Sequence, residues 1–64
     1  MHELSLAQEV MQILVDEAAR HGLRRISAVR LEIGTLRGVV PEVLQSCLGL
    51  ASRGTLAEGL TVQL

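Results

Sequence analysis

The spacing of the apolar residues switches between a helical and a strand-like period along this 64-residue chain. Apolar side chains recur every three or four residues in two segments, 5–21 and 41–54, which is typical of amphipathic helices. They alternate with polar side chains in two other segments, 26–34 and 60–64, which is typical of half-buried strands. Each predicted element therefore has one apolar face, and the elements must stack in layers to bury these faces.

The first predicted helix covers residues 5–21 and has signals at both ends. Ser5 and Gln8 have the spacing of a capping box, in which the hydroxyl and the amide satisfy free backbone N–H groups. Gly22 suits the left-handed conformation that ends many helices. Residues 1–4 precede this helix, and we expect them to form one short strand.

The second helix is predicted to begin at Pro41, because a proline at the first helical position has no N–H that needs a partner. Gly49 lies inside this helix and should cost about 1 kcal/mol relative to alanine. Gly34 and Gly38 bracket a short predicted loop, residues 35–37. The expected order is strand, helix, strand, helix, strand. We therefore predict an α+β fold, a two-layer sandwich in which two helices pack on one face of a small three-stranded mixed sheet.

Composition argues against several classes of function. The formal charge is -1, with six cationic and seven acidic residues, and the chain has no aromatic side chain on which a base could stack. Both facts argue against nucleic-acid binding. The longest uncharged stretch, 43–52, is half of the roughly 20 residues that a membrane span needs, and residues 1–3 do not resemble a signal peptide. Since the single cysteine also excludes an internal disulfide, we expect a cytoplasmic protein that does not bind membranes.

The sequence contains none of the common catalytic motifs: no glycine-rich dinucleotide loop, no phosphate loop with lysine and no His-Glu-x-x-His pair. Cys47 falls on the apolar face of the second predicted helix, so we expect it to be a buried core thiol. His21 precedes Gly22 and is expected to be either a cation at the carboxyl-terminal end of the first helix or a solvated residue. We therefore predict that the protein is not an enzyme.

The amino terminus, Met1-His2-Glu3, offers a compact set of metal ligands. The α-amino nitrogen of Met1, deprotonated backbone amides and the imidazole of His2 are nitrogen donors within three consecutive residues. Square-planar nitrogen coordination suits Ni(II) or Cu(II) rather than zinc. The carboxylate of Glu3 adds an oxygen donor or a hydrogen-bond acceptor beside these ligands.

This terminus opens a series of short motifs that continues through the chain. In order, they are Met1-His2-Glu3-Leu4-Ser5-Leu6-Ala7, Glu17-Ala18-Ala19, His21-Gly22, Val29-Arg30-Leu31-Glu32-Ile33-Gly34, Gly38-Val39, Pro41-Glu42-Val43-Leu44 and Gly54-Thr55-Leu56-Ala57-Glu58-Gly59. With these motifs the sequence resembles the HypA/HybF family, the nickel-insertion accessory proteins of nickel-iron hydrogenase maturation, over essentially its whole length. The nickel-binding domain of that family has two helices packed on a three-stranded sheet, in agreement with the predicted fold.

The resemblance implies a metallochaperone that binds Ni(II) and delivers it to the hydrogenase large subunit, together with the family's partner GTPase, HypB. The implied nickel ligands are the terminal amine of Met1, the imidazole and backbone amide of His2, and the backbone amide of Glu3, with its carboxylate as a further candidate.

The chain departs from the family pattern in two places. Family members continue into a zinc domain built on two Cys-x-x-Cys pairs, whereas this sequence stops at Leu64. We therefore expect residues 1–64 to be a HypA-like nickel-binding domain, truncated before the zinc domain, and zinc is not expected because the cysteine pairs are absent. In the second helix, Ser46-Cys47-Leu48-Gly49 stands where family members often carry phenylalanines, which should lower the packing volume.

One alternative does not involve a metal. Leu60, Val62 and Leu64 lie on the last predicted strand, and an apolar strand at a sheet edge is a template for pairing with another chain. In this alternative the chain is a truncated, non-metal-binding protein-interaction module that forms a homodimer through its exposed C-terminal strand.

Overall fold

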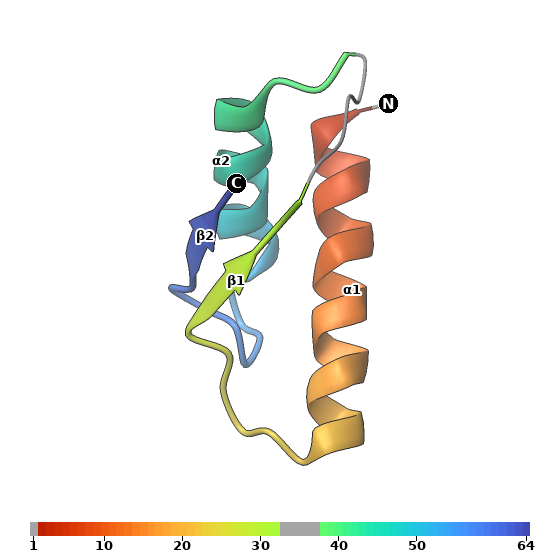
Figure 1. Ribbon diagram of the computed structural model, residues 1–64, viewed down its shortest axis with the longest axis vertical. Helices are drawn as coiled ribbons and strands as arrows, with labels where there is room; N and C mark the ends of the chain where they lie inside the picture. The colour runs from red at the N-terminus through yellow and green to blue at the C-terminus, as the bar shows by residue number, and fades with distance from the viewer. Residues whose placement is uncertain (1, 33–37) are drawn as a thin grey trace.

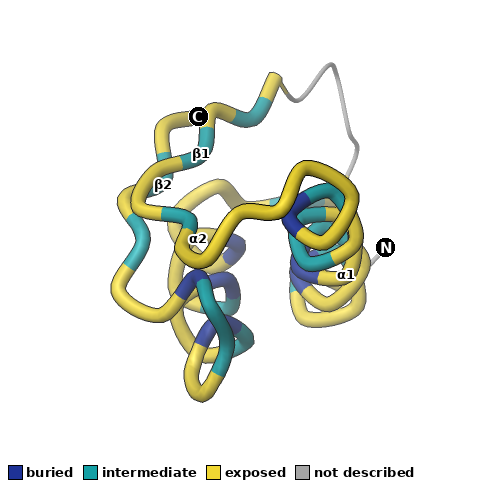
Figure 2. The backbone as a smooth tube through the Cα atoms, turned by 90° about the horizontal axis from the view of Figure 1, so that it is seen from below, coloured by how far each residue is buried: buried dark blue, intermediate teal, exposed yellow. Residues whose placement is uncertain are grey.

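The computed structural model describes residues 2–32 and 38–64. Its elements are, in order, α1 (Glu3–His21), β1 (Ala28–Arg30), α2 (Pro41–Ala51) and β2 (Thr61–Gln63). The two helices lie side by side in one layer, and the two strands lie together in the other (Figure 1 and Figure 2). The predicted α+β class is therefore confirmed.

The sheet is smaller than predicted. Within the described residues it has two strands, which run parallel and place Val29 opposite Val62. The backbone N–H of Leu31 extends this pairing by donating to the carbonyl oxygen of Gln63 at 2.8 Å. The prediction of a three-stranded mixed sheet is wrong, because residues expected to form a first strand belong to a helix. What is left is a strand–helix–strand unit, in which α2 is the crossover that parallel strands require.

The first helix starts earlier than predicted, at Glu3, so residues 2–4 do not form a strand. His2 is the N-cap and has extended backbone angles, φ -79° and ψ 137°. Ser5 consequently lies within the first turn, and its predicted capping box with Gln8 is wrong. The physical reason is the acidic side chain at the first helical position, since a carboxylate there favours a helix start. Met1, which belongs to the same predicted strand, lies outside the described residues.

The end of α1 confirms the sequence prediction. Gly22 has φ 67°, and the N–H of Leu23 donates to the carbonyl oxygen of Ala18 at 2.8 Å. A longer bond of 3.4 Å runs from the N–H of Gly22 to the carbonyl oxygen of Ala19. These two bonds form a Schellman motif, which satisfies carbonyl groups that the helix itself leaves without a donor.

The predicted strand at 26–34 is confirmed in its alternation. Val29 and Leu31 are partly buried, whereas Arg30 and Glu32 are exposed. The strand itself is shorter than predicted, and its predicted end at residues 33–34, like the predicted loop at 35–37, falls outside the described residues.

The core is formed mainly where α1 meets α2, and its buried members are Ala7, Met11, Leu44, Leu48 and Ala57. Leu44 and Leu48 are fully buried and lie one turn apart on α2. Cys47 packs against the same cluster, as predicted, but it is only partly buried. The helix begins at Pro41, as predicted, and ends at Ala51, before the predicted stop.

We expect the buried and exposed leucines of α2 to differ sharply in their contribution to folding. Leu48→Ala removes a side chain with no solvent exposure and should lower the free energy of unfolding by about 2–5 kcal/mol, enough to unfold much of a domain this small. Leu50→Ala, at a position that is 57% exposed, should change it by no more than about 0.5 kcal/mol. Urea unfolding followed by circular dichroism measures both, and equal effects would contradict this description of the core.

Two glycines should respond to alanine in opposite directions. A Cβ at Gly49, inside α2, meets no atom within 4 Å, so Gly49→Ala should raise the free energy of unfolding by about 1 kcal/mol through helix propensity. Gly22→Ala should lower it by about 1 kcal/mol, because φ 67° is unfavourable for a residue with a side chain. Thermal or urea unfolding of the two variants checks the signs, and a stabilised Gly22→Ala protein would be the contrary result.

Candidate metal centre

The predicted ligands lie where α1 begins. His2 is exposed, and its carbonyl oxygen accepts the first hydrogen bond of the helix, from the N–H of Leu6 at 3.1 Å. Glu3 is the first helical residue, and Met1 is outside the described residues. His2 and Glu3 therefore lie together at an accessible end of the molecule, close to the N mark in Figure 1.

The position of the helix start determines what the backbone nitrogens can do. The first four N–H groups of an α-helix have no carbonyl partner within the helix. Since Leu6 is the first residue to donate into α1, the amides of His2 and Glu3 belong to this group of four. Neither amide is needed for a hydrogen bond to a helical carbonyl, although the N–H of Glu3 also interacts with the carboxylate of its own side chain.

The side chain of Glu3 has a defined partner. Its Oε2 atom accepts a hydrogen bond from the backbone N–H of Val40 at 3.1 Å. Val40 is the N-cap of α2, and the two helices begin at the same end of the molecule (Figure 1). One carboxylate thus ties together the starts of two helices that are 37 residues apart in sequence.

The hydrogen bonds to the Glu3 carboxylate favour its charged form. The bond from Val40 contributes most to lowering its pKa below the ordinary value of 4.5, followed by a bond from the backbone N–H of Glu3 itself and by the charge of His2. Glu3 is therefore an anion at neutral pH, and the structure assigns its carboxylate to the tether with Val40.

We expect the amide proton of Val40 to report the ionisation of Glu3. Because the pKa in the folded protein is lowered, the stabilisation from this contact is present above the ordinary carboxyl pKa and is lost as the pH falls through the folded value. The Val40 amide proton shift in NMR spectra should therefore titrate with a midpoint below 4.5. In a Glu3→Gln variant the same shift should stay flat, and a midpoint at or above 4.5 in the native chain would rule out the tether.

The described residues contain no group of three or more His, Cys, Asp or Glu side chains that could hold a metal ion. A site made from a terminal amine, backbone amides and one imidazole is of a different kind, because most of its donors are main-chain atoms. His21, the other histidine, lies at the far end of α1, about 27 Å from Glu3 at 1.5 Å per residue. It is exposed, as predicted, and cannot join the ligands at the start of the helix.

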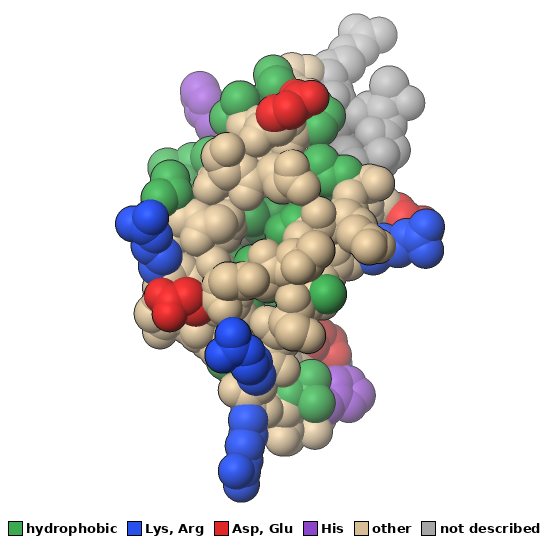
Figure 3. Space-filling model, turned by 90° about the vertical axis from the view of Figure 1, so that its left-hand side faces the viewer, with side chains coloured by type: hydrophobic (Ala, Val, Ile, Leu, Met, Phe, Trp, Pro, Cys, Tyr) green, Lys and Arg blue, Asp and Glu red, His purple; other side chains and the backbone are tan. Residues whose placement is uncertain are grey.

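The surface carries charge in small, separated groups. On the face shown in Figure 3, arginine side chains are spread over the surface, with two close together near its lower end, and acidic side chains lie near some of them. None of the helices among residues 2–32 and 38–64 has the length and apolarity that a membrane crossing requires.

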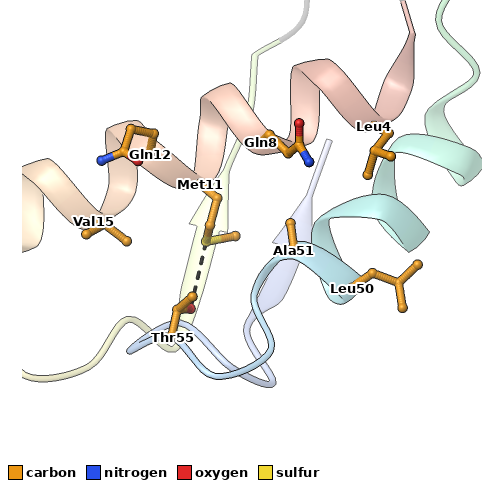
Figure 4. A pocket seen from close by; sticks show the side chains of 8 residues that line it. All are labelled: Leu4, Gln8, Met11, Gln12, Val15, Leu50, Ala51 and Thr55. Carbon is orange, nitrogen blue, oxygen red and sulfur yellow. Dashed lines mark hydrogen bonds between the residues drawn. The ribbon is translucent and has the colours of Figure 1, made fainter.

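A shallow groove of about 460 Å³ runs between α1 and the end of α2 (Figure 4). Met11 and Thr55 meet across its floor, where the hydroxyl of Thr55 lies 4.0 Å from the sulfur of Met11. No lining residue is charged; the set is Leu4, Gln8, Met11, Gln12, Val15, Leu50, Ala51 and Thr55. The groove therefore lacks the carboxylates and imidazoles with which a protein holds a metal ion.

The edge of β2 is less open than the alternative of a homodimer requires. Leu60 and Val62 are partly buried against the core, and Leu64 alone of the three proposed interface residues is exposed, at 50%. The amide nitrogen of Gln45, on α2, also donates to the carbonyl oxygen of Val62 at 2.9 Å. Since α2 already occupies part of this edge, the structure does not favour a dimer formed through the last strand.

Comparison with known proteins decides the family. A family model described as hydrogenase/urease nickel incorporation, metallochaperone, hypA matches residues 1–64. The chain belongs to the HypA family. The resemblance found in the sequence is thereby confirmed, and the family is one of nickel-incorporation metallochaperones for hydrogenase maturation.

Individual relatives agree with this assignment. The hydrogenase maturation factor HypA of Geobacter sulfurreducens is 52% identical over 59 residues, which are 92% of this chain and 51% of that protein. The HypA of Chlorobaculum tepidum is 48% identical over 59 residues, covering 92% of this chain and 52% of that protein. The HypA of Azotobacter chroococcum mcd 1 is 42% identical over 64 residues, covering 100% and 57%. The chain thus spans about half the length of the curated HypA proteins that it matches.

The ligand candidates of this HypA-family chain follow from its sequence, whereas two contacts near the ends of α1 were not predicted. The bond between Glu3 and Val40 had no local signal, because its partners are 37 residues apart. The contact between Glu17 Oε2 and His21 Nε2, at 3.2 Å, did have one, the i,i+4 spacing of the two side chains. The assignment of Met1, His2 and Glu3 as nickel ligands stays a prediction.

Proposed function

We propose that this chain binds Ni(II) at the start of α1 and serves as a metallochaperone that delivers the ion to a hydrogenase large subunit. The ligands are the terminal amine of Met1, the imidazole and backbone amide of His2 and the backbone amide of Glu3. The observation that carries the proposal is the start of the helix at Glu3, because it leaves both backbone amides outside the hydrogen-bond ladder in a chain that belongs to a nickel-incorporation family.

The electrostatics of the helix start support this ligand set. The amino end of an α-helix carries a partial positive charge, which stabilises nearby anions. A backbone amide that binds Ni(II) loses its proton and becomes an anion, so the helix start favours the two amides in their ligating form. The divalent ion and two deprotonated amides together have no net charge, and the helix end therefore does not repel the complete site.

The carboxylate of Glu3 is proposed to position the site rather than bind the ion. It already accepts the N–H of Val40, and that contact holds the first turn of α1 against the start of α2. The backbone amide of Glu3 is a ligand candidate for a different reason, namely that it has no hydrogen-bond partner among the helical carbonyls. Substitutions that change the side chain and leave the backbone intact can therefore distinguish the two roles.

Delivery requires that the ion can leave. His2 is exposed, and the proposed donors come from three consecutive residues at an open end of the fold. Another protein can therefore approach the ion without unfolding the core. In this proposal the acceptor is the hydrogenase large subunit, a HypB-type GTPase takes part in the transfer, the protein acts in the cytoplasm, and the chain itself catalyses no covalent reaction.

Calorimetric titration of Ni(II) into tag-free protein tests the proposal directly. We expect one site in the native-ended chain, and at least roughly 100-fold weaker binding in His2→Gln, since loss of a ligand should exceed the 10–100-fold effect of losing a residue that only supports one. Binding should also tighten with rising pH, because the α-amino group and the amides release protons when the ion binds.

Two controls make the titration specific to the chelate. Acetylation of the amino terminus removes the amine donor and should weaken binding as much as His2→Gln does. Glu3→Gln keeps the backbone amide and should stay within a few-fold of the native affinity. Unchanged binding after acetylation would refute the proposed ligand set, and a loss in Glu3→Gln equal to that in His2→Gln would make the carboxylate a ligand.

A further inference from the structure

The carboxyl-terminal end of α1 brings an imidazole and a carboxylate together, remote from the proposed nickel site. The Nε2 atom of His21 and the Oε2 atom of Glu17 lie 3.2 Å apart, one helical turn from each other. Their side chains are 64% and 46% exposed, respectively. An imidazole nitrogen and a carboxylate oxygen are both ligands for borderline divalent ions such as Ni(II), Co(II) and Zn(II).

The separation of the two atoms fits coordination of a single ion. Bonds of about 2.1 Å from a metal to nitrogen and oxygen, at a right angle, place the two ligand atoms about 3.0 Å apart. The observed 3.2 Å is close to this value, so the pair can take an ion between its two atoms with a small rotation of the side chains. Both residues lie on one helix, one turn apart, so their backbone positions have a fixed spacing.

The helix end favours a cation at this place. The carboxyl end of an α-helix carries a partial negative charge, and His21 is the last residue of α1. The other oxygen of Glu17, Oε1, is paired with Arg20 at 3.3 Å. Arg20 therefore competes with a metal ion for the carboxylate of Glu17. Removing this arginine should strengthen metal binding by the pair.

We infer that Glu17 and His21 form a second, weaker site for a divalent transition-metal ion at the end of α1. Water completes the coordination shell, because the protein supplies two ligands on an exposed surface. The ion is therefore held loosely and exchanges readily. This site shares no residue with the proposed nickel site and lies about 27 Å from Glu3 along the helix axis.

NMR spectra of the full 64-residue chain with added Ni(II) test the inference. Nickel in a site completed by water is octahedral and paramagnetic, so it broadens nearby amide signals. Square-planar nickel, as expected at the amino terminus, is diamagnetic and shifts signals without this broadening. We expect local broadening of the amides around residues 17–22 in the native chain, and the same broadening in His2→Gln, which lacks the proposed imidazole ligand at the start of the helix.

Three variants then decide the assignment. His21→Gln and Glu17→Gln should each abolish the broadening around residues 17–22, with circular dichroism showing that the helix is retained. Arg20→Gln should lower the nickel concentration needed by about twofold, the effect of removing one exposed helical ion pair. Broadening that persists in His21→Gln, or that is absent from residues 17–22 in the native chain, would overturn the second site. Loss of all nickel effects in His2→Gln would also overturn the second site. A failure of nickel binding at the amino terminus alone would not affect the inference of a second site.

Discussion

The packing of α1 against α2 is the interaction on which the rest of this small fold depends. Ala7 and Met11 on one helix and Leu44 and Leu48 on the other are buried in a single cluster, and each large side chain in it contributes a substantial part of the total stability of so short a chain. The same packing places the starts of both helices at one end of the molecule (Figure 1). That arrangement brings Glu3 within hydrogen-bonding distance of Val40, so the core determines the surroundings of the proposed nickel site.

Local patterns predicted the helices well and the sheet poorly, for physical reasons. The helical spacing, the stop at Gly22 and the start at Pro41 are properties of neighbouring residues, and they are confirmed. The number of strands depends instead on competition between local states. A short strand was expected at residues 1–4, but an acidic residue at the first helical position favours the helix, which begins at Glu3 with His2 as its N-cap. The sheet therefore lacks the first of its three predicted strands.

The proposed nickel site also has a part that could be predicted from the sequence and a part that could not. Its ligand set was predictable because the donors come from consecutive residues, and chelation by an amine, amides and an imidazole needs no contact from elsewhere in the chain. The tether between Glu3 and Val40 was not predictable, since it exists only after the two helices have packed. Whether the amides of His2 and Glu3 have a hydrogen-bond partner within the helix depends on where the helix starts. The sequence pattern predicted a start at Ser5, whereas the helix starts at Glu3.

A site built from consecutive residues at a helix start separates metal binding from folding. His2 and Glu3 do not belong to the core cluster, so loading and release of an ion at these residues leave the contacts of Leu44 and Leu48 unchanged. This differs from a structural metal site, in which the binding free energy is part of the folding free energy and removal of the ion unfolds the domain. A protein that passes its metal to another protein needs a site in which metal binding is separate from folding. The fold accordingly supports the proposed site from one side, through the Glu3 carboxylate, and leaves His2 exposed to an acceptor.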